Sequence, residues 1–419
     1  MGNMGLQEAL QTVDYSTIEI NHGQTGVYMF LDWALMQAFG ANLFFLRVPS
    51  LLAGAVLLWA LVIFLRGRGL PWLWQFAGVL AIASTPVFIY FQGEARPYMT
   101  LAASAVCMLA YFSAPAEQRK NLSIQIVGFL GVVIGAVFHP YWIYFLTLTI
   151  VFGYFVRWLD GTRPEGFKAT FKYAGSWLTV AGLGFFILVG QLTWMRWVRD
   201  FYYDPFEMIG SVEVFWTRFW VSHVYADYAS LLLVLAAAGV LLLALRLGKS
   251  AFRFTIPAIA LYLLAALSSL GVSVLSITRG YWIFERQWVA GAILSSIAVV
   301  WLFGSIYKEL ATGSAWYFRV PSLVFLILVV LTFQGAVESH LRAQESWSVE
   351  LEGYALDERS SFEIMTEFSD ADMAYAANVN AVRGGDVWPE FTVWYWKQAG
   401  MRPEFRETNP SWTRFLFTD

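Results

Sequence analysis

The chain has 419 residues, of which 58% are hydrophobic and 14% charged, and its mean hydropathy is +0.56. Soluble domains carry about a quarter charged residues, so this composition excludes an ordinary soluble globular protein and indicates a polytopic membrane protein. The single cysteine, Cys107, excludes an internal disulfide framework, a cysteine-based zinc site and a CxxC redox centre.

Residues 1–45 contain one amphipathic stretch, Val27–Phe39, which we expect to form a helix lying along the membrane interface. Ten apolar blocks of about the length that crosses a bilayer follow. The predicted spans are 46–65, 72–91, 97–112, 122–138, 140–158, 173–192, 228–247, 254–276, 287–307 and 320–337. The fold class is therefore an all-α polytopic membrane protein whose transmembrane domain covers residues 46–337.

The net charge of −3 is distributed unevenly along the chain. Residues 338–419 carry fifteen acids and seven bases, and the preceding residues carry fifteen acids and twenty bases. This predicts a separate acidic C-terminal domain, which we interpret as a small α/β domain with a helix near 371–382. It contains no catalytic motif, so we favour a structural or docking role for it.

Basic residues in the short loops predict the orientation of the spans. If residue 1 lies outside, thirteen basic residues fall in the inner loops and seven in the outer loops, and every lysine before the tail is inside. The acidic domain then lies on the outer face of a cell membrane. The same phase places residues 1–45 outside, which predicts either translocation of this segment by the next helix or a further transmembrane helix ahead of it.

Polar residues collect at the predicted outer helix ends. They are His22 upstream of the interfacial helix; Glu94, Arg96 and Tyr98 before the third span; His139 before the fifth; and Arg279, Glu285 and Arg286 before the ninth. Arginine without lysine suits bidentate recognition of a phosphate, and a nearby carboxylate suits general-base catalysis. The alternative is that these arginines and aromatic residues anchor helix ends, that Glu94 pairs with Arg96, and that His139 is a satisfied helix-end histidine.

Two of these segments carry a resemblance to a known family. Phe45-Leu46-Arg47-Val48-Pro49-Ser50 and Gln92-Gly93-Glu94-Ala95-Arg96-Pro97-Tyr98 resemble, in order and spacing, motifs of the GT-C superfamily of membrane glycosyltransferases. The chain is most similar to the group of protein-mannosyltransferases and aminoarabinose transferases, which use polyprenyl-phosphate sugars. Arg286 stands in the place of that group's conserved arginine, although Gln287-Trp288 replaces its Tyr-Leu. The resemblance covers roughly residues 20–305.

The resemblance implies an inverting glycosyltransferase that moves a sugar from a polyprenyl-phosphate donor to a glycan, lipid or protein acceptor on the outer face. Arg286, Arg279 and Arg96 would bind the donor phosphate, while His22, Tyr98, His139 and Glu285 would line the acceptor pocket. The family's first outer loop carries an Asp-Glu pair that acts as base or metal ligand, and residues 1–45 contain no such pair. Asp14, Glu19 and Glu94 are the available catalytic carboxylates, and a divalent cation is a possible cofactor.

The missing acidic pair leaves a second hypothesis open. The chain would then be a catalytically inactive GT-C-like subunit that binds membrane lipid or scaffolds other membrane subunits. A secondary transporter is less favoured, because internal repeats are absent and acids within the spans are rare. No nucleic-acid partner is expected.

Overall fold

The computed structural model describes residues 27–39, 43–93, 96–139, 141–160, 204–206, 209–223, 229–280, 283–311 and 319–353. Over these residues the chain is mostly helical and forms no strand, so the all-α class is confirmed for them. They divide into two compact units. One unit holds residues 27–34 and the described residues between 46 and 337, and the other holds residues 35–39, 43–45 and 338–353.

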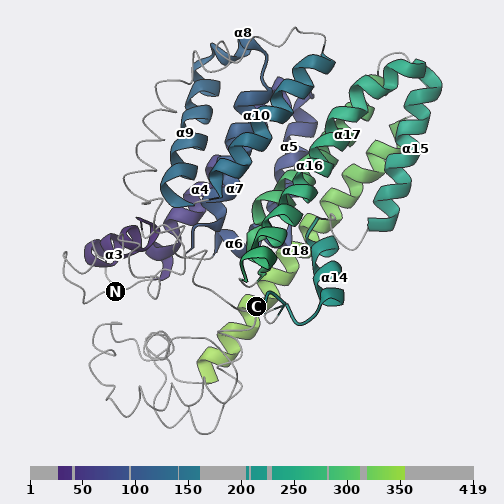
Figure 1. The fold of residues 1–419 in the computed structure, drawn as a ribbon. Helices are drawn as coiled ribbons and strands as arrows, with labels where there is room; N and C mark the ends of the chain where they lie inside the picture. The colour runs from purple at the N-terminus through teal and green to yellow at the C-terminus, as the bar shows by residue number, and fades with distance from the viewer. Residues whose placement is uncertain are drawn as a thin grey trace, which may run out of the picture. The chain divides into compact units, whose positions relative to one another are not determined.

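The described helices are drawn in Figure 1. Their bounds are α3 (Val27–Phe39), α4 (Leu43–Gly67), α5 (Trp72–Ala83), α6 (Pro86–Gln92), α7 (Tyr98–Ser113), α8 (Ala116–Arg119), α9 (Leu122–Phe138), α10 (Trp142–Leu159), α14 (Val212–His223), α15 (Ala229–Leu247), η2 (Gly248–Ser250), α16 (Ala251–Arg279), η3 (Glu285–Trp288), α17 (Val289–Ala311) and α18 (Val320–Gly353). Helix α3 has the bounds predicted for the interfacial helix. Two predictions lie outside the described residues: the span 173–192 and the helix near 371–382.

The predicted continuous span 72–91 is corrected by the structure, which divides it into α5 and α6. Pro86 occupies the first turn of α6, where its missing N–H is not needed, and it ends the preceding helix. The Thr85 hydroxyl accepts a hydrogen bond from the backbone N–H of Phe88 at 3.2 Å and caps the new helix. The sequence Ser84-Thr85-Pro86 therefore ends helix α5 and begins helix α6.

The short break predicted at Phe138-His139-Pro140 is present, because α9 ends at Phe138 and α10 begins at Trp142. A further difference lies at the C-terminal end of the last span, predicted to stop at residue 337. Helix α18 continues to Gly353, so the acidic tail begins as helix. No strand is described in residues 338–353, and the rest of the predicted α/β domain lies outside the described residues.

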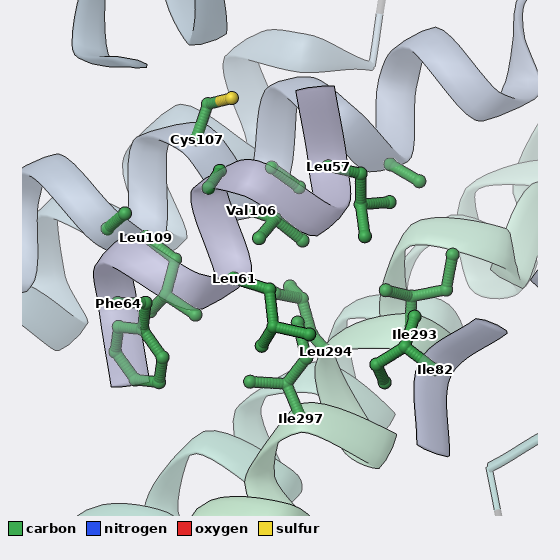
Figure 2. Close-up of a cluster of buried hydrophobic side chains, with 14 of the residues drawn as sticks. Leu57, Leu61, Phe64, Ile82, Val106, Cys107, Leu109, Ile293, Leu294 and Ile297 are labelled. Atoms are coloured by element: carbon green, nitrogen blue, oxygen red, sulfur yellow. The ribbon is translucent and has the colours of Figure 1, made fainter. Parts of the chain in front are cut away.

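Helix α7 is the centre of the larger unit, and all sixteen of its residues are buried. It lies against α9, α10 and α17, and Figure 2 shows its side chains Val106, Cys107 and Leu109 within the apolar core. Glycines allow the close approach. A Cβ added at Gly153 of α10 would clash with the carbonyl oxygen of Phe112 in α7, so the two backbones lie very close together.

Within the part of the chain that the structure describes, four helical stretches are long and apolar enough to cross a membrane: Phe45–Gly67, Trp142–Leu159, Leu231–Thr278 and Arg286–Leu310. The third contains two helices, since α15 and α16 contact each other and reverse direction at η2, where Gly248 has a φ of +58°. Large apolar side chains on both helices are exposed, including Leu233 and Leu263. Such exposed apolar faces belong in lipid, which supports a membrane location for this hairpin.

Candidate functional site

The structure describes only some of the predicted site residues. Asp14, Glu19, His22 and Glu94 lie outside the described residues. Arg279 ends α16 and Glu285 begins η3, and only their backbone positions are described. Four predicted residues are described with their side chains: Arg96, Tyr98, His139 and Arg286.

Three of these four meet around the ring of Tyr98, at the first residue of α7. The ring centroid lies 5.9 Å from that of His139, and the guanidinium carbon of Arg286 lies 5.8 Å from it. Tyr98 and His139 are both buried, at 6% exposure. These residues come from α7, the α9–α10 junction and η3, so the fold brings together groups that are as many as 188 positions apart in the sequence.

The guanidinium of Arg286 lies close to two aromatic rings. Its central carbon lies 3.8 Å from the ring centroid of Phe284, which is much closer than the 5.8 Å to Tyr98. Cation–π contacts of this kind restrict the guanidinium while leaving its N–H edge available for an anion. Arg286 is only partly buried, so this edge remains accessible.

His139 is neutral, and its tautomer follows from its hydrogen bond. The backbone N–H of Tyr141 donates to Nδ1 at 3.2 Å, so Nδ1 carries no proton. Burial lowers the pKa of His139 to about 3, which keeps the ring uncharged at neutral pH. The single ring proton is therefore on Nε2, which is a hydrogen-bond donor.

A second group of contacts ties α3 and α4 to the start of α7. The Ser50 hydroxyl donates to the backbone carbonyl of Arg96 at 3.1 Å, which leaves the Tyr28 hydroxyl as the donor in its 2.8 Å bond to Ser50. The Tyr28 ring lies edge-on to Phe138, 5.9 Å away, next to His139. The bond from Ser50 uses the backbone carbonyl of Arg96, whose side chain is exposed.

Sequence reasoning passed over one carboxylate, Asp32. It lies on α3, four residues after Tyr28, and therefore on the same face of that helix. Its Oδ1 is buried with no hydrogen-bond partner among the described residues, and burial raises its pKa to about 8. The signal was its position: an acid within an otherwise apolar stretch, VYMFLDWALMQAF, is costly unless it has a use.

The described residues contain no group of three or more His, Cys, Asp or Glu side chains that could hold a metal ion. The residues around Tyr98 supply an arginine for an anion and a neutral histidine N–H. Asp32, one helical turn from Tyr28 on α3, supplies a carboxyl group with a raised pKa. Comparisons of the chain with protein families, with curated proteins and with solved structures found no match.

Proposed function

We propose that this chain is a membrane glycosyltransferase of the GT-C type, which transfers a sugar from a polyprenyl-phosphate donor to an acceptor on the outer face of the cell membrane. The supporting observation is the meeting of Arg286, Tyr98 and His139 at one end of the helices. The resemblance implies that Arg286 binds the donor phosphate and that Tyr98 and His139 line the acceptor pocket. The proposal includes ten spans with the C-terminal domain outside.

The donor phosphate would bind to the N–H edge of Arg286. When the bond between the anomeric carbon and the phosphate oxygen breaks, the electron pair leaves with the phosphate, and the guanidinium stabilises the charge that develops there. The Nε2–H of His139 would donate a hydrogen bond to a sugar or acceptor oxygen. Direct attack by the acceptor hydroxyl inverts the anomeric centre, as the resemblance implies.

The acceptor hydroxyl must lose a proton, and Asp32 is our proposed base among the described carboxylates. A pKa near 8 places the carboxylate close to the strength at which a base is effective at neutral pH. Asp14, Glu19 and Glu94 remain candidates from the sequence. Glutamate or aspartate from these segments would replace Asp32 in the proton transfer without changing the role of Arg286.

The test is release of polyprenyl phosphate from a radiolabelled polyprenyl-phosphate sugar by the purified protein in nanodiscs, with a cell-envelope extract supplying the acceptor hydroxyl. We expect Arg286→Ala to reduce the rate constant about 100-fold or more, and Arg286→Lys to restore only part of it, because lysine keeps the charge but loses the fork. Arg246→Ala is the matched control. Arg246 binds the carbonyl of Glu309 on α17 at 3.0 Å and has no proposed contact with donor.

Wild-type turnover in Arg286→Ala at equal folded yield would refute the phosphate role. The alternative is the catalytically inactive GT-C-like subunit. It predicts that the wild type binds the donor without turnover and co-purifies with other subunits.

A further inference from the structure

Three serines on one face of α16 each bond a group from outside that helix. Ser269, Ser273 and Ser276 are spaced four and three residues apart, and all three are buried. Nε2 of His223 lies 2.8 Å from the Ser269 hydroxyl, the indole N–H of Trp288 donates to Ser273 at 2.8 Å, and the Ser276 hydroxyl donates to the Gln287 side chain at 3.5 Å. Two of these partners follow Arg286 directly in the chain.

The segment that carries Arg286 is fixed by further bonds. The Gln287 side chain accepts a hydrogen bond from the backbone N–H of Phe284 at 3.3 Å, and this bond caps the short helix η3 that contains Arg286. The backbone N–H of Ile283 donates to the carbonyl of Pro205 at 2.9 Å. Trp288, the last residue of η3, is fully buried, so its side chain anchors η3 in the core.

The aromatic residues of α14 complete the anchor. The Trp288 ring lies edge-on to Phe215 at 5.5 Å and to Phe219 at 5.4 Å. Phe219 in turn stacks on His223 at 4.3 Å, and its carbonyl accepts from Nδ1 of that histidine at 2.9 Å. Nδ1 is therefore protonated, and in the neutral ring Nε2 accepts the Ser269 proton. Helices α14 and α16 are joined through the same serine face that binds Trp288.

We propose that Trp288 and Gln287 are positioning residues that hold Arg286 against Tyr98, using Ser273 and Ser276 as their attachment points on α16. What Arg286 binds rests on the proposed function, but the positioning itself rests on these contacts. The two positions are also where this chain departs from the Tyr-Leu of the motif it resembles, so the indole and amide bonds belong to this chain's own way of fixing the arginine.

The first test measures hydrogen exchange of the backbone amides of Ile283 and Gln287 in protein reconstituted in nanodiscs without ligand. Trp288→Phe keeps a buried ring but loses the N–H, and Ser273→Ala removes its acceptor. Losing one net hydrogen bond is worth about three- to tenfold in an opening equilibrium, so we expect both variants to exchange about three- to tenfold faster at these amides. The double variant should exchange no faster than either single one.

Two matched controls separate loss of the bond between Trp288 and Ser273 from loss of a hydroxyl or an indole elsewhere in the chain. Ser295→Ala removes a buried hydroxyl that has no hydrogen-bond partner among the described residues. Trp72→Phe changes an exposed tryptophan on α5, away from the anchor. Neither should alter exchange at Ile283 or Gln287. Unchanged exchange in both Trp288→Phe and Ser273→Ala would overturn the positioning role whatever the ligand.

The second test measures the affinity of the same variants for farnesyl phosphate. We expect Trp288→Phe and Ser273→Ala to weaken binding about three- to tenfold, and Arg286→Ala to weaken it more. Gln287→Glu, which keeps an acceptor for the Phe284 N–H and the Ser276 hydroxyl, should retain more affinity than Gln287→Ala.

The two tests fail in different ways. If the wild type does not bind farnesyl phosphate, the proposed donor recognition fails, while hydrogen exchange still decides the positioning role. If Arg286→Ala loses affinity but Trp288→Phe and Ser273→Ala bind as the wild type does, the positioning inference is overturned and the proposed function survives.

Discussion

Replacing Asp32 by asparagine preserves the shape of the side chain and removes its ability to ionise. Burial raises the pKa of this carboxyl to about 8 in the folded chain, against 3.8 ordinarily. Between these two pH values the folded protein keeps a proton that the unfolded chain releases. The contribution of Asp32 to the free energy of unfolding is therefore most favourable below pH 3.8 and is lost as the pH rises through 8. We expect the wild type to lose stability across this window and Asp32→Asn to be spared the loss.

The size of the effect follows from the two pKa values. Each pH unit between them costs about 1.4 kcal/mol, so full burial would cost roughly 5 to 6 kcal/mol over the window. Asp32 is only partly buried, and solvent screens part of the cost. We therefore expect Asp32→Asn to be more stable than the wild type by about 2 kcal/mol at pH 8.5, and by much less at pH 4.5.

The assay is unfolding in dodecyl maltoside by added sodium dodecyl sulfate at pH 4.5, 6.5 and 8.5. Glu213→Gln, at an exposed position on α14, is the matched carboxyl-to-amide control and should follow the wild type. If Asp32 is also the base, donor turnover in the wild type should rise with pH through about 8, and Asp32→Asn should be slow at every pH. Parallel pH dependence of stability in the wild type and Asp32→Asn would refute the reasoning.

Three further expectations concern the scaffold. Gly153→Ala would push a methyl group into the Phe112 carbonyl and should lower the free energy of unfolding by about 1 to 3 kcal/mol. The control Gly335→Ala, in open space on α18, should leave the free energy of unfolding unchanged or raise it by up to about 1 kcal/mol. Unfolding curves in detergent measure both. Burial lowers the pKa of His223 to about 4. As the pH falls from 6.5 to 4, this residue should therefore reduce the free energy of unfolding of the wild type by at most about 1.4 kcal/mol per pH unit. His223→Gln should show a weaker dependence of stability on acid in the same curves. Spin labels at exposed Trp216 and Trp220 should be more accessible to oxygen than to a water-soluble nickel complex if α14 lies at the membrane interface, and the reverse ranking would place α14 in water.

The sequence predicted where the described helices lie better than where they break. Apolar blocks with charged or proline-containing ends identified α4, α7, α9 and α17 to within a few residues. The break between α5 and α6 was missed because Ser84-Thr85-Pro86 is only weakly polar and stands in the middle of an apolar block. Its effect comes from proline geometry and a capping hydroxyl, and neither changes the hydropathy of the segment.

The site was predicted unevenly for a related reason. Tyr98, His139 and Arg286 were found because they lie at outer helix ends in recognisable motifs, and the fold does bring these three together. Asp32 was not assigned to the site, because nothing in the sequence shows that its carboxylate becomes buried. Burial depends on how α3 lies against the rest of its unit, and such tertiary contacts leave no local pattern.

The serines of α16 connect the scaffold to the site. A hydroxyl buried in a lipid-embedded bundle has no water to bond, so it must find a partner within the protein or bond its own helix backbone. The Ser268 hydroxyl bonds its own helix and donates to the backbone carbonyl of Ala265 at 2.6 Å. Ser269, Ser273 and Ser276 also bond His223, Trp288 and Gln287 from outside the helix, and Ser273 does so while donating to the carbonyl of Ser269 at 3.0 Å. An apolar α16 would remove the acceptor that Ser273 offers to the buried indole N–H of Trp288, so the same hydroxyls that are costly in a membrane helix also hold the arginine-bearing segment in place.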